Sequence, residues 1–171
     1  VAKPDWPGRG VDTNYTYMYP EYAKGADILS FDVYPVNSGY DLSLVAKGVD
    51  NLYGYSDGRQ PVWAFIETTK YDTGNQGRPT PEQVKTQVWM ALVHGARGIE
   101  YFCHQFSPFF VEAGPLHEDY SDIREMIASI NAQITELAPV LNSPTISGYA
   151  TVDTVNDVPV DIMTKKYNGI R

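Results

Sequence analysis

Apolar and polar positions divide this chain into short apolar runs separated by longer amphipathic segments. Three of the runs carry the sequences ADILSFDVYPV (26–36), QPVWAFIETT (60–69) and GIEYFCHQF (98–106). The central run is six residues long from Pro61 to Ile66, is rich in β-branched and aromatic residues, and ends in a polar loop. Short continuous runs of this kind are typical of strands that are buried on both faces, as in a parallel sheet.

The segments between and after these runs have helical spacing. Apolar residues recur every three or four positions over 41–55, and Ser56-Asp57-Gly58 closes that segment. A second helix begins with Thr80 as N-cap, Pro81 in the first position and Gln83 completing a capping box, and it ends at Gly95 or Gly98. We expect a third helix after Ser121 as cap, extending to about Pro139, and a short one over 19–24. Strand, helix, strand, helix, strand predicts parallel βα units.

After Asn142-Ser143-Pro144 the pattern changes to that of a small antiparallel β element. The ranges 149–155 and 158–165 look like antiparallel strands, and Asn168-Gly169 is a strong hairpin turn signal. The chain stops two residues after that turn and begins with Val1. We therefore expect a fragment whose natural continuation is missing.

Composition narrows the possible partners. The chain has 171 residues, 43% of them apolar, which indicates one globular domain with a real core. Its net charge of −8 argues against nucleic acid and anionic membranes as partners, because phosphate groups require a basic surface. No run of eighteen apolar residues occurs, so we expect no membrane span. The cellular location stays open.

Several kinds of chemistry lack their motifs. The sequence has no GxSxG elbow, no P-loop and no GxGxxG, and its histidines and acidic residues lack metal-ligand spacing. We therefore expect neither a cofactor nor a metal. Trp6 and Arg9, in the segment DWPGRG, either line a site or anchor a loop.

The best candidate for chemistry is Glu67. It stands where the central apolar run ends, and α/β folds place their active sites at the carboxyl ends of strands. Alternatively, Glu67 only caps the strand or pairs with an arginine. Asp32 and Tyr34 share a face at the end of the first run, and Asp32 either belongs to a polar site or binds a nearby donor. His104, at the end of the third run, is a site residue or a satisfied core histidine.

These segments resemble a known family. The order ADILSFDVYPV, QPVWAFIETT and PEQVKTQVWMALVHGARGIEYFCHQF is similar to the last three βα units of (β/α)8-barrel retaining glycoside hydrolases, the group of cellulases and β-galactosidases. The Asp-x-Tyr-Pro ending of the first run, residues 32–35, and the Gly-x-x-Tyr-Phe of the third run support the likeness. It covers about residues 26–141.

The resemblance implies a fold, a substrate and roles for individual residues. The fold would be α/β, a partial (half) TIM barrel over 1–144 followed by the start of a truncated antiparallel β element over 145–171. The partner would be a carbohydrate, with Glu67 as the nucleophile that cleaves a β-linked sugar. The residues that orient Glu67 or bind hydroxyls would be Asp32, Tyr34, Tyr71, Tyr101 and His104, and those that stack on sugar faces would be Phe106, Phe109 and Phe110.

The same resemblance exposes a gap. Retaining hydrolysis uses two carboxylates about 5–5.5 Å apart. In the family the acid/base is a Glu that follows an Asn, and no Asn-Glu pair occurs in this chain. We therefore expect impaired activity in the isolated chain, and self-association as a homo-oligomer through the exposed edges of the half-barrel. The alternative is a non-catalytic carbohydrate-binding or structural half-barrel.

Overall fold

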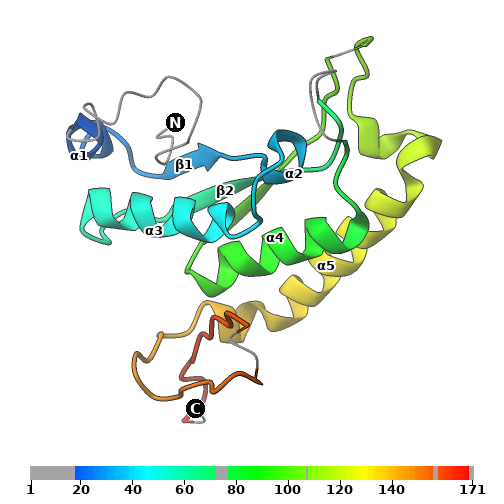
Figure 1. Ribbon diagram of the computed structural model, residues 1–171. Coiled ribbons are helices and arrows are strands. Elements are labelled where there is room, and N and C mark those ends of the chain that lie inside the picture. The colour runs from blue at the N-terminus through cyan, green and yellow to red at the C-terminus, as the bar shows by residue number, and fades with distance from the viewer. Residues whose placement is uncertain (1–17, 72–76, 107, 156–157, 170–171) are drawn as a thin grey trace.

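The fold is built on a three-stranded parallel sheet in the order β1-β2-β3. The computed structural model describes residues 18–71, 77–106, 108–155 and 158–169 (Figure 1). The strands are β1 (Leu29–Asp32), β2 (Val62–Glu67) and β3 (Gly98–Phe102). The predicted α/β class with parallel βα units is thus confirmed, and the arrangement is compatible with part of a (β/α)8 barrel.

The long helices lie together on one face of this sheet (Figure 1). Helix α3 (Leu44–Ser56) contacts β1 and β2, α4 (Pro81–Val93) contacts β2, and α5 (Ser121–Leu141) packs on α4. Two short helices, α1 (Tyr19–Ala23) and α2 (Pro35–Ser38), flank β1. The 3-10 turns η2 (Gly114–Leu116) and η3 (Glu118–Tyr120) precede α5. The core lies between the sheet and these helices, and its fully buried members include Phe31, Val45, Val49, Val62, Ala64, Ile66, Val84, Val88 and Ile123.

The two predicted helix starts have different outcomes. At α4 the capping box is confirmed, because the Gln83 amide donates to Thr80 Oγ1 at 3.2 Å and the Thr80 amide donates to Gln83 Oε1 at 2.9 Å. The prediction that Ser121 caps α5 is wrong. Helix η3 runs directly into α5, so Ser121 already has helical φ and ψ of −57° and −38°, and Tyr120 holds the cap position without a side-chain hydrogen bond.

The first strand is shorter than the apolar run that predicted it. Pro35 has no backbone N–H with which to extend the ladder, and it opens the one-turn helix α2 instead. Gly39, with φ of 72°, ends that helix in the left-handed region. The residues after Asp32 therefore turn across the carboxyl end of the sheet.

The prediction of two antiparallel strands over 149–155 and 158–165 is wrong, because the described residues of those ranges form no strand. The apolar side chains of these ranges have no layer to cover them, and Val155 and Val160 are 83% and 52% exposed. The pairing that forms is an antiparallel bridge between Thr145 and Lys165. Asn168 and Gly169 have φ of 49° and 79°, both positive, as a type I′ turn requires.

Helix α3 approaches β1 most closely at Gly48. A Cβ atom there would lie 2.2–2.7 Å from three ring atoms of the buried Phe31, whereas a Cβ atom at Gly54 of the same helix would meet nothing within 4 Å. The missing side chain at Gly48 therefore sets how near α3 lies to the sheet.

We predict opposite effects of alanine at these two glycines. Gly48→Ala should lower the free energy of unfolding by about 1–3 kcal/mol, because the ring of Phe31 must move in a filled core. Gly54→Ala, the matched control, should raise it by about 0.5–1 kcal/mol through helix propensity alone. Urea denaturation followed by circular dichroism measures both, and equal effects of the two variants would contradict the close approach.

Candidate functional site

The carboxyl ends of the strands bring three carboxylates close together. In the parallel register Asp32 of β1 and Glu100 of β3 both pair with Phe65 of β2, and Glu67 pairs with Phe102 two residues further along. The burial of β2 alternates up to Ile66, with Val62, Ala64 and Ile66 on the helix side, so Phe65, Asp32 and Glu100 point to the face away from the helices. Glu67 breaks this alternation, because it is fully buried and the side chain of Gln87 on α4 lies beside its carboxyl.

Glu67 is fully buried and its carboxylate accepts three hydrogen bonds. Oε1 accepts from the Val36 amide at 2.7 Å, and Oε2 accepts from the amide and the Nδ2 of Asn37 at 2.9 Å and 2.6 Å. The two amides belong to the first turn of α2, where N–H groups have no partner within the helix. Glu67 thus joins the end of β2 to the loop that follows β1.

Asn37 is the residue of this site that the sequence did not reveal. It is 1% exposed, its Nδ2 also donates to the Thr69 carbonyl at 2.8 Å, and its Oδ1 accepts from the Tyr71 amide at 3.2 Å. One side chain therefore orders both loops at the carboxyl end of the sheet. One feature of the sequence could have predicted the position of Asn37. Pro35 and Gly39 mark the start and the end of a single helical turn, and Asn37 lies inside it.

Burial raises the pKa of the Glu67 carboxyl above its usual value, and the hydrogen bonds from Asn37 and Val36, together with the side chain of Gln87 on α4, oppose this shift. The carboxyl has no exposed surface. Direct contact between Glu67 and a ligand therefore requires the α2 turn to move.

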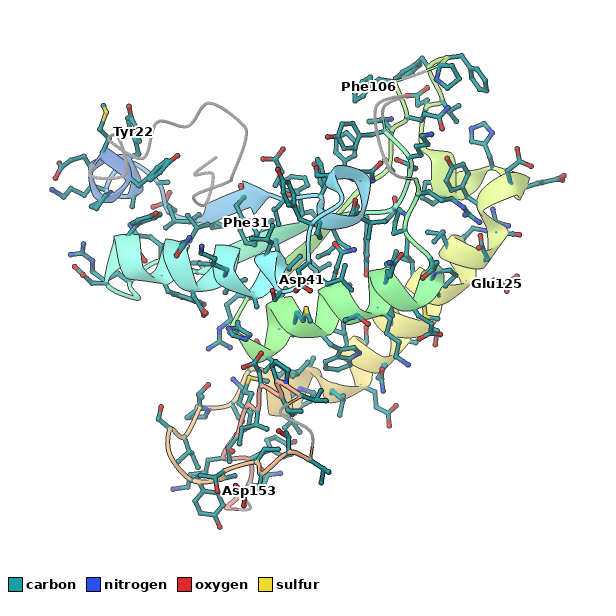
Figure 2. The ribbon with its side chains drawn as sticks, in the orientation of Figure 1. Tyr22, Phe31, Asp41, Phe106, Glu125 and Asp153 are labelled. Carbon is teal, nitrogen blue, oxygen red and sulfur yellow. The ribbon has the colours of Figure 1, made fainter. Side chains whose placement is uncertain are left out.

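Beside this buried carboxyl lies a cluster of aromatic rings. Tyr34, Tyr71 and Phe102 pack together, with the Tyr34 ring centroid 5.3 Å from that of Tyr71 and 5.0 Å from that of Phe102. The rings of His104, Phe106 and Phe110 continue the cluster at centroid distances of 5.9–6.4 Å. Tyr34 is buried, whereas Phe106 and Phe110 are 56% and 61% exposed. Figure 2 shows Phe106 at the outer tip of this end of the molecule.

His104 links the ring cluster to the loop that follows β3. Its Nδ1 accepts from the Ala113 amide at 3.2 Å, and its carbonyl accepts from Thr69 Oγ1 at 2.8 Å. An accepting Nδ1 places the proton of the neutral ring on Nε2. The imidazole therefore presents a donor while it stacks on Phe110 at an interplanar angle of 27°.

A pocket of about 780 Å³ adjoins Phe110. Phe109 and Tyr120 provide aromatic walls, and the remaining lining residues are Arg78, Gln105, Val111, Glu112, His117 and Asp119. Arg78 binds Asp122 through two hydrogen bonds of 2.9 Å and 2.8 Å and lies over the Tyr120 ring at 5.1 Å. A guanidinium held in this way is ordered and still presents donors to the pocket.

The structure gathers most, but not all, of the residues that the sequence singled out. Tyr34, Tyr71, His104 and Phe106 meet in the ring cluster, and Asp32 and Glu67 end the adjacent strands β1 and β2. Tyr101 lies apart, because its hydroxyl donates to Asn131 Oδ1 of α5 at 2.9 Å.

Burial raises the pKa of Tyr101 to about 12. Trp6 and Arg9 lie outside the described residues. Within the part of the chain that is described, no group of three or more His, Cys, Asp or Glu side chains is arranged to hold a metal, and no helix is long and apolar enough to cross a membrane.

No protein-family model matches this chain, and no curated protein sequence does. Among solved structures it is similar to dihydrodipicolinate synthase from Bacillus clausii, with a TM-score of 0.44 and 18% identity over 82% of this chain and 49% of that one. A hypothetical protein from Ruminiclostridium thermocellum matches with a TM-score of 0.42 and 12% identity, over 70% of this chain and 86% of that one. The chain spans about half the length of the synthase.

These findings correct the family resemblance drawn from the sequence. The solved enzyme that the chain matches is a synthase from a family other than the glycoside hydrolases, and no family model supports the latter. The assignment to the retaining glycoside hydrolases was therefore wrong. At TM-scores below 0.5, neither similarity gives the chain another family in its place. Its function has to be argued from its own residues.

The raised pKa of Glu67 predicts a pH dependence of stability. The folded chain holds this proton more tightly than the unfolded chain, so the contribution is fully present below the ordinary pKa of 4.5 and is lost as pH rises through the folded value. The difference in unfolding free energy between the wild type and Glu67→Gln should therefore fall as pH rises above 4.5. Urea denaturation at several pH values measures it, and a difference that grows with pH would contradict the shift.

Proposed function

We propose that this chain binds a neutral carbohydrate at the carboxyl end of its sheet. The observation that carries the proposal is the ring cluster, which extends from the buried Tyr34 to the exposed Phe106 and Phe110 and adjoins a pocket of about 780 Å³. The buried Tyr34 and the half-buried rings beside it, those of Tyr71, Phe102 and His104, fix the positions of the exposed ones. Exposed apolar groups gathered in one place mark a binding surface.

Aromatic faces suit the chemistry of sugars. A pyranose presents C–H groups on its faces and hydroxyls around its edge, so its faces pack on aromatic rings and its edge requires hydrogen-bonding groups. The pocket supplies such groups through Arg78, Gln105 and Glu112, and His104 presents a donor between the rings. These groups donate as well as accept, which matches a neutral polyol.

Binding is favoured over catalysis by the state of Glu67. A nucleophile must reach the substrate, and this carboxylate is fully buried with three N–H groups directed at it. Its role in the proposal is to position Tyr34 and Tyr71, whose segments its hydrogen bonds and those of Asn37 hold.

Removing the exposed rings should weaken sugar binding. We expect Phe106→Ala and Phe110→Ala each to reduce affinity for the best oligosaccharide of a panel of soluble β-glucans, xylans and mannans by about tenfold, or about 1.4 kcal/mol. Affinity gel electrophoresis identifies the polysaccharide, and isothermal titration calorimetry measures the dissociation constant.

The matched control for these variants is Leu116→Ala. Leu116 is 74% exposed and apolar but lies outside the ring cluster, so its removal should change affinity less than about twofold. If no polysaccharide retards the wild type, the proposal is wrong. An equal loss in all three variants would show nonspecific apolar adsorption.

Hydrolysis of a β-glycoside with Glu67 as nucleophile is a second candidate. It is favoured by one observation, namely that Asp32, Glu67 and Glu100 lie near one another at the carboxyl ends of adjacent strands. A pair of neighbouring carboxylates is the minimum for such chemistry. The reaction would additionally require the α2 turn to expose Glu67.

Activated substrates test the nucleophile alone. Dinitrophenolate departs without protonation, so dinitrophenyl β-glycosides need no acid catalyst. If Glu67 reacts, the wild type should give a burst or slow turnover that Glu67→Gln abolishes, while Glu67→Gln still binds the oligosaccharide. Release of dinitrophenol at the background rate by a folded wild type that binds sugar would reject hydrolysis and leave the binding proposal standing.

A further inference from the structure

A second cavity, of about 570 Å³, lies at the opposite end of the sheet from the ring cluster. Its walls come from residues 58–61 before β2, from residues 92–97 before β3, and from the carboxyl-terminal end of α5. Thr145, Met163 and Lys165 of the carboxyl-terminal segment close it. In Figure 2 this segment, marked by Asp153, lies far from Phe106, so the two sites are separate.

The charge of this cavity is opposite to that of the chain. Arg59, Arg97 and Lys165 line it, and none of the Asp and Glu residues that the structure describes does, although the chain has 21 acidic and 13 basic side chains. His94 also lines it, but its ring nitrogens lie 2.9 Å and 3.2 Å from the carboxylates of Asp50 and Asp161. Arg59 likewise lies 3.6 Å from the carboxylate of Asp57.

Two of these cations have no carboxylate partner among the described residues. Arg97 donates from one terminal nitrogen to the Leu141 carbonyl at 3.3 Å. Lys165 donates to the Ser143 carbonyl at 3.3 Å and to Thr145 Oγ1 at 2.9 Å. Burial and the nearby charge of Arg97 lower the pKa of Lys165, so the two like charges lie close together.

Stabilisation of helix ends accounts for only part of this charge. The cavity lies at the carboxyl-terminal ends of α3, α4 and α5, where cations are favourable. Each helix end carries about −0.5 charge, so three such ends offset about three quarters of the charge of Arg97 and Lys165, with Arg59 assigned to Asp57. A guanidinium has five N–H donors, and Arg97 directs one of them to a helix carbonyl. Among the described residues no carboxylate takes up its remaining donors or the surplus charge, which are therefore available to a ligand.

The lining also includes apolar side chains, beside the polar Gln60, Asn142 and Thr145. Tyr53, Leu92, Ile134, Leu141 and Met163 form a surface beside the cations. A bare inorganic ion would leave this surface uncovered, whereas a molecule with an anionic head and an apolar body would cover it.

We propose that this cavity binds a small organic oxyanion, with its phosphate or carboxylate head on Arg97, Lys165 and Arg59 and its apolar body against Leu92, Ile134 and Met163. The site is independent of the carbohydrate site proposed above. It lies in an otherwise acidic protein, so binding requires this local excess of positive charge.

Titrations with four probes test the class of ligand. Phenyl phosphate carries both head and body, inorganic phosphate the head alone, phenol the body alone, and benzoate exchanges phosphate for carboxylate. In amide correlation NMR spectra we expect saturable shifts at Gly95, Ala96 and Thr145, with phenyl phosphate binding at least about tenfold more tightly than inorganic phosphate or phenol. The comparison with benzoate identifies the preferred head group.

Charge variants test the residues. Arg97→Gln with Lys165→Gln should weaken phenyl phosphate binding by at least about tenfold, while the control Lys47→Gln with Lys85→Gln, which removes the same charge from exposed positions, should change it less than about twofold. Arg97→Lys keeps the charge and should retain most of the binding. Arg59→Gln, at a 64% exposed side chain, gives an independent loss even if the double variant does not fold.

Two results would overturn the proposal. The first is amide NMR shifts that do not saturate at millimolar phenyl phosphate and that occur near exposed lysines over the whole surface. The second is equal weakening by the cavity variants and by the Lys47 and Lys85 control.

Discussion

The buried carboxylate of Glu67 is the interaction on which the carboxyl end of the sheet depends. Three N–H groups from Val36 and Asn37 converge on it, and Asn37 extends the network to Thr69 and Tyr71. An ionisable group in the interior is tolerated only with such partners, and the loss of any one would leave a buried polar atom unpaired. The loops that carry Tyr34 and Tyr71 are therefore fixed by one shared acceptor. The aromatic surface proposed for sugar binding is built on that fixed base.

The two ends of the sheet offer different chemistry because different parts of the chain form them. At the carboxyl ends of the strands the loops carry aromatic rings, and only their innermost members are buried. At the amino ends the cavity is closed by helix ends and by the carboxyl-terminal segment, which contributes Lys165. Charge is likewise divided, since the cations gather at the amino ends while the carboxylates Asp32, Glu67 and Glu100 lie toward the carboxyl ends of the strands.

Features that depend on local sequence could be predicted. The three apolar runs became the three strands, and Thr80 with Gln83 formed the expected capping box, because periodicity and caps are properties of neighbouring residues. Asn37 was missed since its partners lie thirty or more positions away, and the basic cavity was missed since Arg59, Arg97 and Lys165 meet only after folding. Tyr101 was placed with the site because its strand alone does not reveal which face the helices cover. The family resemblance rested on strand-end patterns, and such patterns follow from parallel βα construction rather than from one chemistry.

Helix α2 also has a consequence for the order in which the chain folds. Four residues are far too few to form a stable helix in isolation, because nucleation is unfavourable and no further turns repay it. The acceptor that holds its first turn lies 30 and 31 positions further along the chain, at the end of a different strand. Helix α2 therefore forms only after β1 and β2 have paired, and the residues between them must close a long loop first. The carboxyl end of the sheet is thus completed late, after the layer of α3 against β1 and β2 is in place.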